Sequence, residues 1–163
     1  ATSGAVRMSP RVGIGVDAHQ LGPGKPLMIG LVHIPHPQGL VGHSDGDVVA
    51  HALCDALLSA TGGPDLGQLF PPGDAEWKDA SGARLLGVVK ERLAAIGATI
   101  HNAHAVVICE VPRLAPHRDA MQSALTELLG APVSVHATTT DHMGFTGRGE
   151  GIACQAVALV EVP

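Results

Sequence analysis

The sequence predicts an α/β sandwich (an α+β arrangement), in which one mixed β-sheet is covered by helices on one face. Segments that alternate or run apolar, as strands do, are interleaved with three segments whose apolar residues recur every three or four positions, as in helices. Such an order favours a sheet with helices packed against it. Because no internal repeat or shift in composition divides the 163 residues, we expect a single domain over residues 1–163.

The first strand is expected over residues 11–19, where Val12, Ile14 and Val16 alternate with two glycines. The small and polar residues before it, 1–9, are expected to be a frayed start. The remaining strands are expected over residues 27–34, 99–109, 133–137 and 152–162.

Three helices are expected between these strands. The first covers residues 47–60, and Asp47 is its expected N-cap because its carboxylate can accept a hydrogen bond from a free amide one turn on. Within this helix His51 and Asp55 stand four residues apart, so their side chains share one face. The other two helices are expected over residues 81–96 and 117–129, each followed by a glycine, Gly97 and Gly130.

Composition argues against several classes of function. The net charge is −5 and no run of Lys or Arg occurs, so a nucleic-acid-binding surface is not expected. No apolar run approaches the roughly 20 residues of a membrane span, and no leader segment is expected. Cys54, Cys109 and Cys154 are far apart and lie in apolar runs. We therefore expect free thiols and a cytoplasmic location.

One group of residues with metal-binding chemistry joins the first strand to the first helix. Asp17 and His19 are two apart, so on an extended strand they point to the same side, and His51 lies on the helix. One carboxylate and two imidazoles with an open fourth position suit a catalytic divalent metal, zinc in particular. From spacing alone, the alternative is an Asp-x-His pair that is simply exposed to solvent.

Two loops carry residues that suit phosphate groups. His43 and Ser44 precede the first helix, where free amides and the helix dipole favour an anion; the alternative is an ordinary capping loop. Residues 138–151 combine hydroxyls with Asp141 and Arg148, a set that can hold phosphates and a hard cation such as Mg²⁺. The alternative for this second loop is a glycine-rich β-turn with an Arg–Glu surface pair.

Two further loops are candidates for binding. Residues 65–78 form a loop that is long for a compact domain, and such loops are usually functional or mobile. Residues 109–115 follow a strand end and include Pro112, and the end of a strand is a common ligand position in α/β folds. Alone, this second segment is better explained as a simple turn.

Together these segments resemble the 2-C-methyl-D-erythritol 2,4-cyclodiphosphate synthase family. The resemblance covers residues 11–160 and rests on motifs in the family's order: RVGIGVDAH, HSDGDVVAHALCDALLSA, PDLGQLFP, WKDASGARLL, VPRLAPH and TTTDHMGFTGRGEGIACQAVALV. It implies a homotrimer with active sites between subunits. It also implies a phosphorus–oxygen lyase of non-mevalonate isoprenoid (terpenoid) biosynthesis, which converts 4-diphosphocytidyl-2-C-methyl-D-erythritol 2-phosphate into the 2,4-cyclodiphosphate and CMP.

The resemblance also implies roles for single residues. Asp17, His19 and His51 would hold Zn²⁺, and Asp141 would hold Mg²⁺ or Mn²⁺ together with the substrate diphosphate. The substrate-binding set implied by the family consists of Asp17, Ala18, His19, His43, Ser44, Asp65, Leu66, Gly67, Phe70, Pro71, Pro72, Gly73, Asp74, Cys109, Glu110, Val111, Pro112, Arg113, Leu114, Ala115, Thr138, Thr139, Thr140, Asp141, Phe145 and Arg148.

His43 and Thr139 match the family's positions that steady the transition state, so they are the expected catalytic residues. Phe145 and Arg148 match positions on the trimer axis, where relatives can hold an isoprenoid diphosphate. Asp141 stands where the family usually has glutamate, so its carboxylate is one methylene shorter. Two alternative functions use the same residues: a metal-dependent phosphodiesterase with water as nucleophile, and a non-catalytic trimer that binds isoprenoid diphosphates.

Overall fold

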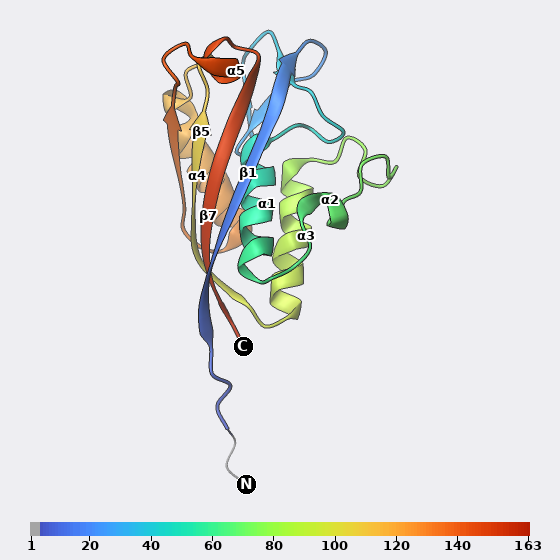
Figure 1. The fold of residues 1–163 in the computed structure, drawn as a ribbon, viewed down its shortest axis with the longest axis vertical. Coiled ribbons are helices and arrows are strands. Elements are labelled where there is room, and N and C mark those ends of the chain that lie inside the picture. The colour runs from blue at the N-terminus through green and yellow to red at the C-terminus, as the bar shows by residue number, and fades with distance from the viewer. Residues whose placement is uncertain (1–3) are drawn as a thin grey trace.

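The main structural unit is a twisted five-stranded sheet, seen in a computed structural model that describes residues 4–163 (Figure 1). Within these residues its strand order is β4-β1-β7-β5-β6. β5 pairs parallel with β6, whereas the other neighbours pair antiparallel. The predicted mixed α/β fold is therefore confirmed. The strands are β1 (Ser9–Gly22), β4 (Gly39–Leu40), β5 (Thr99–Ile108), β6 (Val133–Thr138) and β7 (Gly151–Val162).

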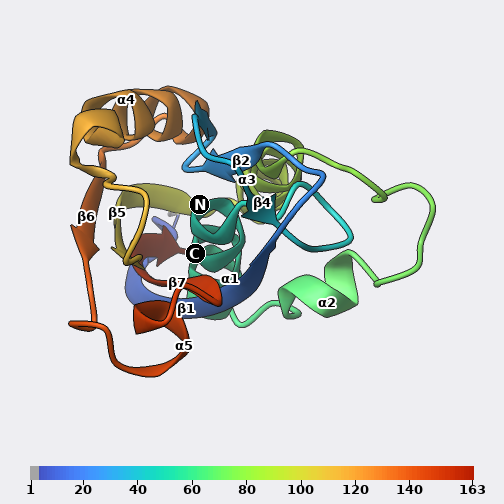
Figure 2. The same cartoon turned by 90° about the horizontal axis from the view of Figure 1, so that it is seen from above.

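Helices cover one face of this sheet. Figure 2 shows α1 against β1 and β7, with α3 farther out and α4 beside β5 and β6. The long helices are α1 (Val48–Ala60), α3 (Gly82–Ala95) and α4 (Arg118–Leu129), each within one residue of its predicted bounds. In the described part of the chain, no helix combines the length and apolarity needed to cross a membrane.

The predicted strand over 27–34 is wrong, and with it the expectation of one sheet. This segment folds back on itself as β2 (Leu27–Ile29) and β3 (Val32–Ile34), which form a separate two-stranded sheet. The two residues between them, Gly30 and Leu31, have φ of 59° and 67°. Positive φ at both central positions produces a tight hairpin turn, which the apolar run of the sequence conceals.

Short structured segments lie inside the predicted loops. The loop 65–78 contains a one-turn helix, α2 (Leu66–Leu69), and the loop 138–151 contains α5 (Gly144–Gly147). A 3₁₀ turn, η1 (Ala115–His117), leads into α4. The frayed start was expected over residues 1–9. Residues 1–3 lie outside the described chain, whereas Ser9 already pairs with Val162 in the sheet.

β1 turns its glycines towards the helices and its large apolar side chains away from them. A Cβ on Gly13 would lie 1.8 Å from the Ala56 carbonyl oxygen, and one on Gly15 would lie 2.0 Å from that of Ala52. α1 can therefore approach the strand closely only because these side chains are absent. On the other face Ile14, like its neighbours at 12 and 16, is more than half exposed. We call this surface the outer face of the sheet.

Candidate active site

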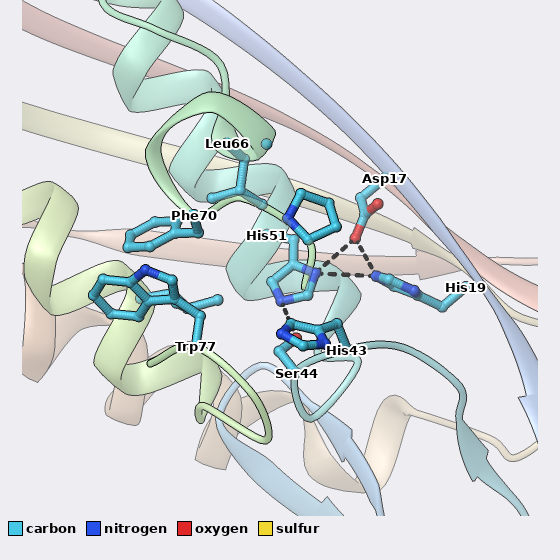
Figure 3. Close-up of a pocket in the computed structure, with 11 residues that line it drawn as sticks. Asp17, His19, His43, Ser44, His51, Leu66, Phe70 and Trp77 are labelled. Atoms are coloured by element: carbon cyan, nitrogen blue, oxygen red, sulfur yellow. Dashed lines mark hydrogen bonds and ion pairs between the residues drawn. The ribbon is translucent and has the colours of Figure 1, made fainter. Parts of the chain in front are cut away.

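Three predicted metal ligands converge where β1 meets α1 (Figure 3). Oδ2 of Asp17 lies 2.7 Å from Nε2 of His19 and 3.0 Å from Nδ1 of His51. The two histidine nitrogens are 3.0 Å apart. Donor atoms bound to one ion at about 2 Å can be at most about 4 Å apart, so all three pairs fit a single divalent cation. Among residues 4–163 this is the one cluster of its kind found.

The electrostatics of the cluster keep Asp17 ionised. Burial alone would raise the pKa of Asp17, but the hydrogen bonds from His19 and His51 and their charges outweigh it and lower the pKa to about 2. Burial alone would lower the pKa of His19, but its hydrogen bond with Asp17 and the charge of that carboxylate raise it. An ionised carboxylate beside two imidazole nitrogens is therefore preformed to hold a cation, either a proton or a metal ion.

Asp47 sets the position of the loop before α1. Its carboxylate accepts hydrogen bonds from the N–H groups of Val49 and Ala50, so the predicted N-cap is confirmed. It also accepts from Gly30 at 2.9 Å and Leu31 at 2.7 Å, in the β2–β3 turn. Burial raises the pKa of Asp47, and the backbone donors oppose this shift. One buried side chain thus ties the hairpin to the helix that carries His51.

Two further acids hold neighbouring segments. Asp45 accepts from the Gly82 N–H at the start of α3, at 2.9 Å. Asp55, one turn beyond His51 on α1, accepts from the Leu66 N–H at 2.8 Å. It therefore anchors the first turn of α2. Both acids accept hydrogen bonds from backbone N–H groups, and both position loops that border the Asp17–His19–His51 cluster.

The cluster lies in a cavity with one polar and one apolar wall. The apolar wall comes largely from the 65–78 loop, where the Phe70 and Trp77 rings meet edge to face at 4.6 Å and Arg84 covers Trp77 at 4.7 Å. Trp77 and Leu85 were not predicted; Trp77 is the chain's only tryptophan, whereas Leu85 resembles any core leucine of a helix. The cavity is lined by Asp17, His19, His43, Ser44, His51, Leu66, Gly67, Phe70, Pro72, Trp77 and Leu85.

A second cavity lies between the end of β5 and the end of β6. It brings the predicted loop after β5 together with Thr138 and Thr139. The two expected catalytic residues, His43 and Thr139, therefore line different cavities of one chain. This second cavity is lined by Cys109, Glu110, Pro112, Arg113, Leu114, Ala115, Ala137, Thr138 and Thr139. The predicted residues that line neither cavity are Ala18, Asp65, Pro71, Gly73, Asp74, Val111, Thr140, Asp141, Phe145 and Arg148.

The loop after β6 has an unusual backbone. Asp141 and His142 have φ of 51° and 66°, in the left-handed region that non-glycine residues rarely adopt. The His142 N–H donates to Oε1 of Glu110 at 2.6 Å, which fixes this conformation from the loop after β5. Arg148 forms an exposed ion pair with Glu150 at 3.0 Å. Backbone strain at a polar loop beside a cavity is typical of functional positions.

A mixed α/β sheet with a possible metal site, formed by three donors where β1 meets α1, defines the general class of this protein. The model of the YgbB family matches residues 10–161, and the chain belongs to that family. The resemblance seen in the sequence is confirmed by its relatives. A Cutibacterium acnes protein named 2-C-methyl-D-erythritol 2,4-cyclodiphosphate synthase is 52% identical over 151 residues, which cover 92% of this chain and 90% of that protein.

Two further likenesses bear on function. A solved structure of 2C-methyl-D-erythritol-2,4-cyclodiphosphate synthase in a CDP-bound form has a TM-score of 0.84 and 35% identity, covering 92% of this chain and 99% of that one. A Granulibacter bethesdensis protein named bifunctional enzyme IspD/IspF is 48% identical over 98% of this chain, but only 43% of that protein is covered. The chain thus spans less than half the length of this bifunctional relative.

Proposed function

We propose that the chain is a cyclodiphosphate synthase, which converts 4-diphosphocytidyl-2-C-methyl-D-erythritol 2-phosphate into 2-C-methyl-D-erythritol 2,4-cyclodiphosphate and CMP. An oxygen of the 2-phosphate forms a bond to the β-phosphorus, and the bond from that phosphorus to the oxygen bridging to the α-phosphate breaks. The observation that carries the proposal is the Asp17–His19–His51 cluster on the polar wall of a cavity. The likeness of the whole chain to a CDP-bound synthase of the same fold supports the substrate class.

The cluster fits Zn²⁺ by its donor set. One carboxylate oxygen and two imidazole nitrogens leave a fourth position open, as in catalytic zinc sites. A bound zinc ion would polarise a phosphate oxygen, and a second cation, Mg²⁺ or Mn²⁺, would neutralise charge on the diphosphate. We propose Asp141 as the protein ligand of that second cation. It lies in the loop after β6, where its backbone φ is 51°.

The protein's own residues supply positioning. Phosphoryl transfer depends mainly on alignment and charge stabilisation, so holding both ends of one substrate makes the attack intramolecular. We assign to His43 and Thr139 the role of stabilising the transition state. His43 is itself held by the 70–74 segment, since its Nε2 lies 3.1 Å from the Asp74 carbonyl oxygen. The apolar wall around Phe70 and Trp77 suits the carbon skeleton of the erythritol.

A homotrimer would unite the two cavities. The first measures about 190 Å³ and the second about 160 Å³. Each is smaller than the roughly 300–1,000 Å³ of pockets that hold drug-sized ligands. A site formed by the first cavity of one subunit and the second of its neighbour would also bring His43 and Thr139 to one substrate. The apolar outer face offers the contact surface, and we assign Phe145 and Arg148 to the trimer axis, as a site for an isoprenoid diphosphate.

The cysteines support a cytoplasmic location. All three are free and buried in the described chain. Burial raises the pKa of each thiol, to about 11 for Cys109. Such thiols are unreactive, and unpaired cysteines are usual in reducing compartments.

The reaction itself tests the proposal. With zinc and magnesium, the protein should release CMP from the substrate, and ³¹P spectra should show the cyclic diphosphate. A linear hydrolysed product would instead favour the phosphodiesterase, and absence of CMP from folded, metal-loaded protein would reject both enzymes.

His51→Ala gives a sharper version of this test. It removes one of three metal donors, so bound zinc and CMP release should both fall below a few per cent of wild type. The matched control is His33→Ala, which removes an exposed histidine of β3 and should leave both unchanged. Zinc is measured by metal analysis after dialysis, and helix content by circular dichroism.

A further inference from the structure

Both ring nitrogens of His51 have partners, and only one of them belongs to the metal cluster. Nδ1 faces Asp17 and His19, whereas Nε2 lies 2.9 Å from the Ser44 hydroxyl oxygen (Figure 3). Both side chains are enclosed, with His51 5% and Ser44 8% exposed. Solvent therefore contributes little to the hydrogen bonding of His51 Nε2, and the Ser44 hydroxyl is its main partner.

His19 provides the comparison within the same cluster. Its Nδ1 lies 3.2 Å from the Val41 carbonyl oxygen, and a carbonyl can only accept. Nδ1 of His19 must therefore carry the hydrogen, which leaves the Nε2 lone pair for a metal. His51 is arranged in the opposite sense, since its Nδ1 faces the cluster. To bind a metal there, its hydrogen must lie on Nε2, which points at Ser44.

We propose that Ser44 is a positioning residue for the metal site: its hydroxyl oxygen accepts the His51 Nε2–H and so commits Nδ1 to the metal. A metal-bound histidine generally donates its other N–H to an oxygen, which fixes both the tautomer and the ring orientation. Val41 supplies that oxygen for His19, and Ser44 supplies it for His51. This role rests on the cluster holding a metal, as in the proposed function, but not on the reaction catalysed.

The surroundings of Ser44 suit an acceptor held in place. Lys25 Nζ donates to the Ser44 carbonyl at 2.9 Å and to that of Gly42 at 2.7 Å, which clamps the loop on both sides of His43. The Gly46 N–H points at the same hydroxyl oxygen at 3.4 Å. With His51 and Gly46 as donors, the hydroxyl keeps its own hydrogen free for an anion. Ser44 can therefore contact a substrate phosphate while it orients the zinc ligand.

Metal affinity distinguishes this role from phosphate binding alone. Ser44→Ala should weaken zinc binding about 10- to 100-fold in a competition assay with a chromophoric chelator, without substrate. Ser44→Thr keeps the hydroxyl and should stay much nearer to wild type. The matched control is Ser134→Ala, which removes another Ser–His hydrogen bond, to His104 on the sheet, and should leave zinc affinity unchanged. If Ser44→Ala binds zinc as tightly as wild type, the proposal is overturned.

A spectroscopic signature tests the atoms directly. In zinc-loaded, ¹⁵N-labelled protein, the His51 Nε2 should carry a slowly exchanging hydrogen and Nδ1 should show the shift of a coordinated nitrogen. In Ser44→Ala the Nε2–H signal should broaden through exchange. Coordination through Nε2 in the wild type would overturn the proposal even if the alanine variant failed to fold. Because neither readout involves turnover, a negative result here is separate from failure of the proposed activity.

Discussion

At the scale of single residues, the cluster is organised around one carboxylate oxygen. Oδ2 of Asp17 contacts both histidines, and its ionised form is held by them against the cost of burial. Such an arrangement predicts a stability contribution that depends on pH. In metal-free protein, a carboxyl whose pKa is about 2 when folded and 3.8 when unfolded stabilises the fold above pH 3.8 and loses this effect as the pH falls towards 2.

Asp17→Asn therefore gives a pH-dependent loss of stability in metal-free protein. The free energy of unfolding at pH 5 should fall by roughly 2 kcal/mol relative to wild type, from a pKa difference of nearly two units. The difference should shrink as the pH is lowered from 4 to 3. Urea unfolding in the presence of a chelator measures it. A difference that stays constant over this range would show that ionisation of Asp17 contributes nothing.

At the scale of elements, sequence patterns predicted local features and missed distant ones. The N-cap role of Asp47 follows from a residue and the helix directly after it, and it was predicted. Its second role, as acceptor for Gly30 and Leu31, joins segments 16 and 17 positions apart and has no local signal. The β2–β3 hairpin was missed for a related reason, since an apolar run does not reveal a turn made by backbone angles alone.

Asp47→Ala should therefore cost more than loss of a helix cap. A lost cap costs about 1 kcal/mol, and the two N–H groups of the hairpin turn would lose their acceptor in the interior, for a total of about 3 kcal/mol or more. Ser81→Ala is the control, because Ser81 caps α3 with a single bond from Arg84 N–H. Urea unfolding measures both. Equal losses would mean that the hairpin contacts contribute little.

At the scale of the whole molecule, the outer face is the feature that a single chain leaves unexplained. The strand predicted over residues 11–19 has one glycine face and one apolar face, but alternation cannot tell which of the two is buried. The structure buries the glycine face. Three branched side chains of β1, 54% or more exposed, remain outside with half-exposed Val157 of β7. Adjacent exposed apolar residues mark interaction surfaces. The placement of the predicted loops around two separate cavities was equally beyond local patterns, because it depends on how distant loops meet.

Ile14→Glu should dissociate the proposed trimer. A carboxylate buried against another subunit has no partner there, so the assembly should fall to monomers in sedimentation velocity at micromolar concentration. The monomer should keep its zinc, because Asp17, His19 and His51 come from one chain, yet lose nearly all CMP release. Ile96→Glu, at the exposed end of α3, should remain trimeric and active. A monomeric wild type would refute the trimer at once.

Trp77 gives the molecule an intrinsic optical reporter. It is the chain's only tryptophan. It lines the cavity that contains Asp17, His19 and His51, and it contacts both the Phe70 ring and the Arg84 guanidinium. Emission excited at 295 nm therefore comes from this wall alone, without any introduced label. Ligand entry, displacement of the 65–78 loop and local unfolding can each be followed as a change in emission wavelength or quenching. The same indole would let stopped-flow experiments time substrate arrival separately from CMP release in the proposed reaction.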